Sequence, residues 1–258
     1  MAMPSVWFYL IALILVATVM WWRQRQTGNA GWVDVFWSWG TGATGLMFLV
    51  GGDGHLVPRV LAMLLLLCWS VRLGGHIYLR VRRETHEDGR YAAMREALGG
   101  KTQPVFLLFF WGQALLAWLF ALTFKVIGEQ DEWSLLAVSF GTLLGLLAIA
   151  GEGLADRQLN RFKSDPANKG KTCRQGLWYY SRHPNYFFEW LHWISYPLIA
   201  MGASFGGWLW LLPLAMFLFL WFVTGIPYTE RQAIKTRGDD YRDYQRTTSA
   251  FFPRRPSP

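Results

Sequence analysis

Seven apolar runs, each of roughly twenty residues, recur along this chain of 258 residues and limit it to a membrane fold. A hydrocarbon core about 30 Å thick takes about twenty helical residues to cross, which is the length of these runs. Hydrophobic residues make up 53% of the chain, and the segments between the runs are too short for a soluble domain. The sequence therefore predicts an all-α, polytopic membrane protein with seven transmembrane helices, at roughly 4–22, 32–51, 57–79, 104–126, 133–151, 186–203 and 207–227.

The first run is expected to stay in the membrane as a span. No basic residue precedes it, and Trp21, Trp22 and Arg23 stand where a signal peptide would carry small residues for cleavage. We expect the whole chain, 1–258, to form a single membrane-embedded domain. Within it, helices in 1–126 precede a C-terminal region, 133–258, that carries the signature motif described below.

Basic residues are spread so unevenly between the loops that they predict an orientation. All but three of the 25 Lys and Arg residues follow the first, third, fifth and seventh runs. Arg59 and Lys125 lie on the opposite side, and Arg72 lies within a run. Because basic loops stay in the cytoplasm, we expect the N-terminus outside and the C-terminus in the cytoplasm. The net charge of +8 then requires no nucleic-acid partner, although anionic lipid or an anionic cofactor would suit it.

Long segments face the cytoplasm in this topology, and long connections often carry function. They are 80–103, 152–185 and 228–258. Asp156, Asn160 and Lys163 recur at i, i+4 and i+7, so a helix that continues through 152–163 would carry them on one face. The basic residues of these segments could form one pocket for a phosphate-rich cofactor, or they could only fix the topology.

The stretch 176–189 is the most informative motif, because it sets polar side chains against an apolar run of membrane-spanning length. The polar residues concerned are Arg182, His183, Asn185 and Glu189. A membrane interface collects Trp and Tyr but does not require this cluster, so a functional site is the default interpretation. The bland alternative is that Arg182 and His183 only enforce topology.

The start of the sixth run repeats the helical spacing seen in 152–163. Asn185, Glu189 and His192 stand at i, i+4 and i+7, which places them on one helix face. Pro184 suits the first turn of such a helix, where its missing N–H costs nothing. The free backbone N–H groups of that turn can bind an anion.

Charged residues within the runs allow two interpretations, because buried charge in lipid must be paired or must face a polar cavity. Asp34 could form a helix-locking ion pair with Arg72, or it could line a cavity that opens to the cytoplasm. The five histidines are too few for a membrane di-iron cluster, so we expect no metal. No phosphate loop or Rossmann glycine motif is present, so a nucleotide would bind between helices.

Several motifs together resemble the steroid 5α-reductase C-terminal superfamily, in its bacterial branch of uncharacterised substrate. That superfamily is related to isoprenylcysteine and lipid methyltransferases. The signature is 176–189, which reads GLWYYSRHPNYFFE. The resemblance extends over nearly the whole chain, through 69–73, 83–95, 151–163, 224–231 and 238–253.

The resemblance implies a reductase that holds NADPH in the cytoplasmic half of the helical bundle. Asn185 and Glu189 fall where such reductases approach the nicotinamide amide, and Lys163 falls where they hold phosphate. The cofactor-binding candidates are Arg83, Asp156, Asn160, Lys163, Arg182, His183, Asn185, Glu230, Arg231, Tyr241 and Tyr244. The catalytic candidates are Glu189, Asp34, His192 and Tyr228.

The chain departs from the steroid reductases at the residues that grip the enone. Their second span carries a Gln-Glu pair and their third a Tyr, whereas this chain has Asp34 in the second run and Trp69 at the Tyr position. The implied activity is therefore reduction of an activated C=C bond in a lipid, isoprenoid or steroid-like substrate, and a steroid itself is not specified.

Two alternatives remain open. An S-adenosylmethionine-dependent methyltransferase of membrane lipids or isoprenoids would share the Arg-His-Pro segment and the acidic, Tyr-rich tail. A non-enzymatic lipid-binding membrane protein would have no use for the polar cluster. Under all three hypotheses, the reductase and the two alternatives, we expect a multi-pass protein of the bacterial inner membrane. Its partners would be membrane lipids and a lipophilic small molecule, with no nucleic acid and no obligate protein partner.

Overall fold

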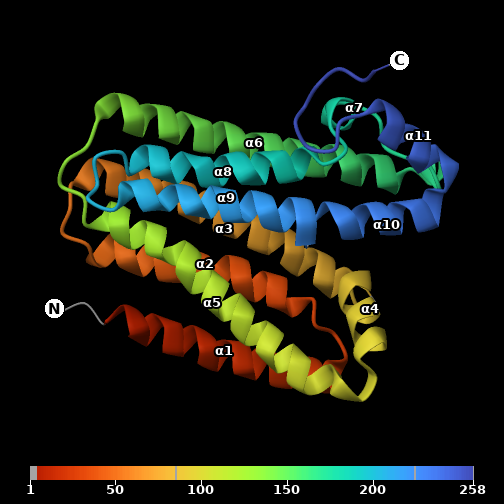
Figure 1. The fold of residues 1–258 in the computed structure, drawn as a ribbon, viewed down its shortest axis with the longest axis horizontal. Helices are drawn as coiled ribbons and strands as arrows, with labels where there is room; N and C mark the ends of the chain where they lie inside the picture. Colours follow the sequence, from red (N-terminus) through yellow and green to blue (C-terminus); the bar gives the residue numbers. More distant parts are fainter. Residues whose placement is uncertain (1–4, 85, 224, 258) are drawn as a thin grey trace. The chain divides into compact units, whose positions relative to one another are not determined.

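The computed structural model describes residues 5–84, 86–223 and 225–257, and every regular element in these ranges is helical (Figure 1). The predicted all-α class is therefore confirmed. The chain divides into two compact units. The N-terminal unit comprises Met1–Ser134 with Gly202–Gly206, and the C-terminal unit comprises Leu135–Met201 with Gly207–Pro258. This division falls beside the predicted one at 126 to 133, and a single domain over the whole chain stays a prediction.

The N-terminal unit, red to yellow-green in Figure 1, is built around α2. Its helices are α1 (Val6–Thr27), α2 (Trp32–Gly51), α3 (Leu56–Arg83), α4 (Gly89–Leu98) and α5 (Thr102–Gly128). Helix α2 packs against α1, α3 and α5. Small residues allow this close approach, because a Cβ on Gly42 would meet the Ser70 hydroxyl and one on Gly45 would meet the Phe124 ring.

The C-terminal unit, green to blue in Figure 1, is built around the pair α6 and α8. Its helices are α6 (Leu135–Ser164), α7 (Leu177–Tyr180), α8 (Pro184–Ile199), α9 (Leu211–Leu218), α10 (Ile226–Arg237) and α11 (Asp239–Thr247), with a π-helical turn at Phe219–Val223. On α6, Gly141 faces the Ser195 carbonyl and Gly151 faces the Phe188 ring, so the two helices run antiparallel in close contact. The helix predicted to continue through 152–163 is confirmed.

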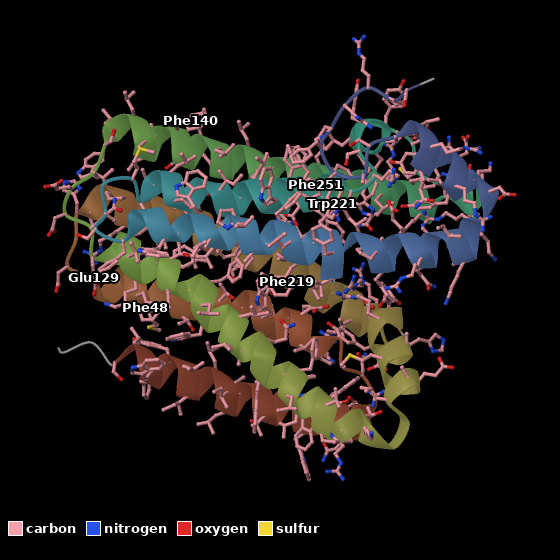
Figure 2. All side chains as sticks on the ribbon, in the orientation of Figure 1. Phe48, Glu129, Phe140, Phe219, Trp221 and Phe251 are labelled. Atoms are coloured by element: carbon pink, nitrogen blue, oxygen red, sulfur yellow. The ribbon has the colours of Figure 1, made fainter. Side chains whose placement is uncertain are left out.

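An aromatic cluster closes the C-terminal unit around Phe251, which is fully buried. Figure 2 shows this ring beside Trp221, with the centroids 5.9 Å apart. The rings of Phe187, Trp190 and Phe217 also pack on Phe251, at centroid distances of 5.9, 5.8 and 5.3 Å. The end of the chain is therefore anchored in the core of this unit.

Five helices in the described ranges are long and apolar enough to cross a membrane. They are Val6–Thr27, Leu56–Arg83, Gly89–Gly128, Leu135–Ser164 and Gly206–Arg237. Helix α2 coincides with the predicted run at 32–51 but is not one of these five candidates. Helix α8 has only 16 residues and carries the polar motif. Five candidate spans indicate a multi-pass membrane protein, whereas the seven-span path and its orientation stay predictions.

Candidate functional site

The first turns of α8 carry the polar motif. Pro184 occupies the start of the helix, as predicted, and the helix then sets Asn185, Glu189 and His192 on one face. Asn185 is half-buried, while Glu189 and His192 are buried. The predicted spacing is confirmed, and the polar face continues into the buried part of the helix.

The buried polar groups of α8 differ in how they are satisfied. The Trp193 indole donates to Glu189 Oε1 at 2.9 Å, and the Tyr196 hydroxyl lies 3.0 Å from His192 Nε2. The amide oxygen of Asn185 is shielded from solvent and has no hydrogen-bond partner among the described residues. An unsatisfied buried acceptor costs about 1–3 kcal/mol, so Asn185 marks a place where a ligand donor would be favourable.

The partner helix α6 carries Asp156, Asn160 and Lys163 on one face, from half-buried Asp156 to the exposed Lys163. Glu152 lies one turn before Asp156 and is 4% exposed. It follows Gly151, which packs on α8, so α6 and α8 each bring one buried carboxylate into this unit. Sequence reasoning did not single out Glu152. A carboxylate inside an otherwise apolar helix, one turn from Asp156, was the available signal.

Arg182 and His183, just before α8, converge on Glu230 of α10. Arg182 Nε donates to Glu230 Oε1 at 2.7 Å, and His183 Nε2 lies 3.2 Å from the same oxygen. Gln245 donates to the other carboxylate oxygen at 2.6 Å. Arg182 Nη1 also donates to the carbonyls of Gln245 and Thr248. We call this cluster of Arg182, His183, Glu230 and Gln245 the latch.

The C-terminal strap, residues 248–257, lies along the same segment. The backbone N–H of Arg182 donates to the Ser249 carbonyl at 2.8 Å, and that of Arg254 donates to the Tyr180 carbonyl at 3.0 Å. The Ser181 hydroxyl donates to the Phe251 carbonyl at 2.9 Å. The strap and the latch together fix the backbone that leads into α8.

Burial sets the protonation of the latch histidine. Burial lowers the pKa of His183 below its ordinary value of 6.5, although the hydrogen bond and the charge of Glu230 act in the opposite direction. His183 is therefore neutral at pH 7, and its Nε2–H donates to the Glu230 carboxylate. Its ring also stacks on Tyr186, with the centroids 5.2 Å apart.

The two predicted tyrosines of α11 are buried as well. The Tyr244 hydroxyl donates to the carbonyls of Trp178 and Ser181, so it ties α11 to the segment before α8. Burial raises the pKa of both Tyr241 and Tyr244, and the phenols stay protonated at neutral pH. Tyr244 is thus a structural contact in this unit, and its role toward a cofactor stays a prediction.

The remaining candidates of the C-terminal unit lie on α10. Arg231 is exposed, and its Nε donates to the Pro227 carbonyl one turn earlier at 3.0 Å. Tyr228 is half-buried on the same helix. The structure places these two residues within one turn of Glu230, and their assigned roles stay predictions.

Asp34 belongs to an ion network of the N-terminal unit. Arg90 Nη2 donates to its Oδ2 and the Tyr91 hydroxyl to its Oδ1, both at 2.7 Å. Arg80 and Asp88 extend this network at 3.3 Å from each other. Both oxygens of the Asp34 carboxylate are therefore engaged by the protein. Arg83, at the end of α3, is exposed.

Of the two alternatives for Asp34, an ion pair with Arg72 is not the one that the structure shows, because the Asp34 carboxylate is bound by Arg90 and Tyr91. The register of α2 against α3 explains this choice of partners. A Cβ on Gly74 would meet the side chains of Ser38 and Trp39, so residue 74 lies opposite residue 38. Asp34 lies one helical turn before residue 38 on α2, and because α2 and α3 are antiparallel it lies opposite residues of α3 that follow residue 74, beyond Arg72. The arginines near Asp34 are instead Arg80 and Arg90.

Comparison with known proteins places the chain in a family. The family described as "Protein of unknown function (DUF1295)" matches residues 20–248, which is most of the chain. The chain is also similar to "Uncharacterized protein C594.04c" of Schizosaccharomyces pombe (strain 972 / ATCC 24843). That protein is 28% identical over 278 residues, which cover 95% of this chain and 78% of the yeast protein. No solved structure matches the chain.

Proposed function

Because this chain belongs to the DUF1295 family, in the steroid 5α-reductase-like group, we propose that it is an integral membrane reductase that uses NADPH. It reduces an activated C=C bond in a lipid, isoprenoid or steroid-like substrate that reaches it from the bilayer. In this proposal the chain crosses the bacterial inner membrane seven times. Its N-terminus is outside, and the polar end of α8 faces the cytoplasm.

The observation that carries the proposal is the buried amide oxygen of Asn185, which lacks a hydrogen-bond partner in the described part of the chain. A nicotinamide carries a carboxamide, which offers both a donor and an acceptor. Either orientation of the Asn185 amide can therefore pair with it. Pairing would remove the free-energy cost of the unsatisfied oxygen, and this relief favours the bound state.

The chemistry of the surrounding side chains also suits a dinucleotide. Asp156 and Asn160 on α6 supply an acceptor and an amide for ribose hydroxyls, and Lys163 supplies a positive charge for phosphate. S-adenosylmethionine carries a sulfonium cation and no phosphate, so the basic residues at this end of the unit suit it less well. No group of three or more His, Cys, Asp or Glu side chains suited to a metal ion occurs among the described residues.

The residues of α8 would then have different roles in order along the helix, from cofactor binding at its start to proton donation further along it. NADPH, when bound, supplies a hydride. Asn185 would hold the carboxamide at the helix start, and Glu189, fixed by Trp193, would orient it one turn deeper. His192 and Tyr196 are the next side chains along the helix that carry an exchangeable proton, and His192 would donate its proton to the substrate. Their full burial excludes water, which strengthens each polar contact.

Thermal unfolding of the detergent-purified protein with and without NADPH tests this proposal. We expect NADPH to raise Tm, because a ligand that binds only the folded state stabilises it. The Asn185→Leu variant should keep or raise the Tm of the ligand-free protein, because it removes an unsatisfied buried oxygen, and it should lose the shift with NADPH. Thr142→Val is the matched control, since the Thr142 hydroxyl in the same unit is another shielded polar oxygen without a hydrogen-bond partner among the described residues. A shift with S-adenosylmethionine and none with NADPH would favour the methyltransferase instead.

A further inference from the structure

Arg237, the last residue of α10, has a guanidinium that the protein leaves largely unused. In the described ranges no carboxylate pairs with it, and its recorded side-chain contact is with the Tyr241 ring. The guanidinium carbon lies 5.6 Å from the ring centroid. This cation–π contact uses none of the guanidinium N–H groups as hydrogen-bond donors, and no acceptor among the described residues binds them, so they stay available to a ligand.

The acids near Arg237 already have other partners. Asp240 accepts from the Thr172 backbone N–H at 2.7 Å and pairs with Arg174 at 3.2 Å. Asp243 pairs with Arg174 at 2.8 Å, and Glu230 is held in the latch. No carboxylate among the described residues therefore forms an ion pair that would neutralise the positive charge of Arg237.

A second cation approaches the same place from α6. Cys173 is buried and packs against Leu159 and Phe162 of that helix, and Lys163 lies one turn beyond Leu159. Burial raises the pKa of the Cys173 thiol, and the charges of Arg237 and Lys163 both act on it in the opposite direction. The backbone N–H of Thr172 donates to Asp240 at the start of α11 at 2.7 Å, so the segment that carries Cys173 joins the end of α6 to the corner between α10 and α11. Lys163 and Arg237 lie at the two helix ends that this segment brings together within the C-terminal unit.

We infer that Arg237 and Lys163 form a subsite for a phosphate monoester, the 2′-phosphate of NADPH, and that Arg237 sets the preference for NADPH over NADH. The inference rests on the proposed function. The in-plane N–H groups of Arg237 match two phosphate oxygens, and Lys163 adds a point charge. The contact with the Tyr241 ring holds the guanidinium in place, which reduces the entropy lost on binding.

Calorimetric titration of the full-length protein with NADPH and with NADH tests this subsite without an activity assay. We expect Arg237→Gln to weaken NADPH binding about tenfold or more, as loss of a charge-assisted contact does, and to leave NADH binding unchanged. Arg237→Lys should lose less, because the charge remains. Lys235→Gln is the matched control, since Lys235 is exposed on the same helix and outside the subsite.

The outcomes separate the two claims. If Arg237→Gln weakens NADPH and NADH equally, or weakens neither, the 2′-phosphate assignment is overturned while the reductase proposal stands. If the wild-type protein binds neither dinucleotide, the proposed function fails and the subsite fails with it. If Arg237→Gln leaves NADPH binding intact but lowers binding to phosphatidic acid vesicles, the phosphate belongs to a lipid headgroup and the inference is wrong.

Discussion

Arg182 Nε and Glu230 Oε1 lie 2.7 Å apart although the two residues are 48 positions apart in the sequence. This ion pair joins the segment before α8 to α10. Arg182 and His183 of the signature motif are predicted from the sequence to bind a cofactor, but their side chains form hydrogen bonds within the protein, to Glu230 and to the Gln245 carbonyl. We expect them to position the start of α8, so that Asn185 and Glu189 meet the ligand.

Neutralising Glu230 should destabilise the C-terminal unit. Glu230→Gln leaves the mostly buried Arg182 without its counter-charge, and breaking such a pair costs about 3–5 kcal/mol. We expect a clear drop in Tm in detergent. Asp239→Asn is the control, because its pair with Arg242 is exposed and such pairs contribute about 0–1 kcal/mol. Equal Tm values for the two variants would contradict the structural role of the latch.

Acidification should weaken the folded protein through His183. Its pKa is lowered in the folded state by burial, while the unfolded chain takes up the proton near the ordinary value of 6.5. Between these two pKa values the unfolded state binds more protons, so stability rises with pH and falls as pH drops below about 6.5. His183→Gln keeps an N–H donor for Glu230 and should flatten this part of the Tm profile. A wild-type Tm profile without a slope there would contradict a buried neutral His183.

Removing the Phe251 ring should detach the strap. Phe251 is fully buried among aromatic rings, and Phe→Ala in a core typically costs about 3–5 kcal/mol. Phe251→Ala should therefore lower Tm strongly and expose the strap to limited proteolysis. Phe252→Ala is the matched control, since Phe252 is its exposed neighbour. Similar proteolysis rates for both variants would show that Phe251 is not the anchor.

The orientation can be checked directly with a reporter fused after Pro258. The uneven distribution of Lys and Arg predicts that the C-terminus lies in the cytoplasm. We expect a reporter that is active only in the cytoplasm to be active there, and one that requires export to be silent. Activity of the exported reporter would place the basic end of the C-terminal unit outside and remove its access to NADPH.

Local features of this fold could be predicted from the sequence because they depend on local geometry. Pro184 and the spacing of Asn185, Glu189 and His192 follow from the helix period alone. The partner of Asp34 could not be predicted, since it depends on the register between α2 and α3 and on the position of α4.

The latch was missed for a related reason. Its partners come from α10, α11 and the strap, and only the folded C-terminal unit brings them to Arg182. Glu152 was missed because a single carboxylate within an apolar helix looks like the end of a membrane span. Its burial depends on the packing around α6, which the helix period does not reveal.

Parallel calorimetric titration of the wild-type protein with NADPH and with S-adenosylmethionine tests the central claim most directly. We predict saturable binding of NADPH, lost in Asn185→Leu, and no binding of S-adenosylmethionine. Saturable binding of S-adenosylmethionine with none of NADPH would contradict the reductase assignment and the role given to Asn185.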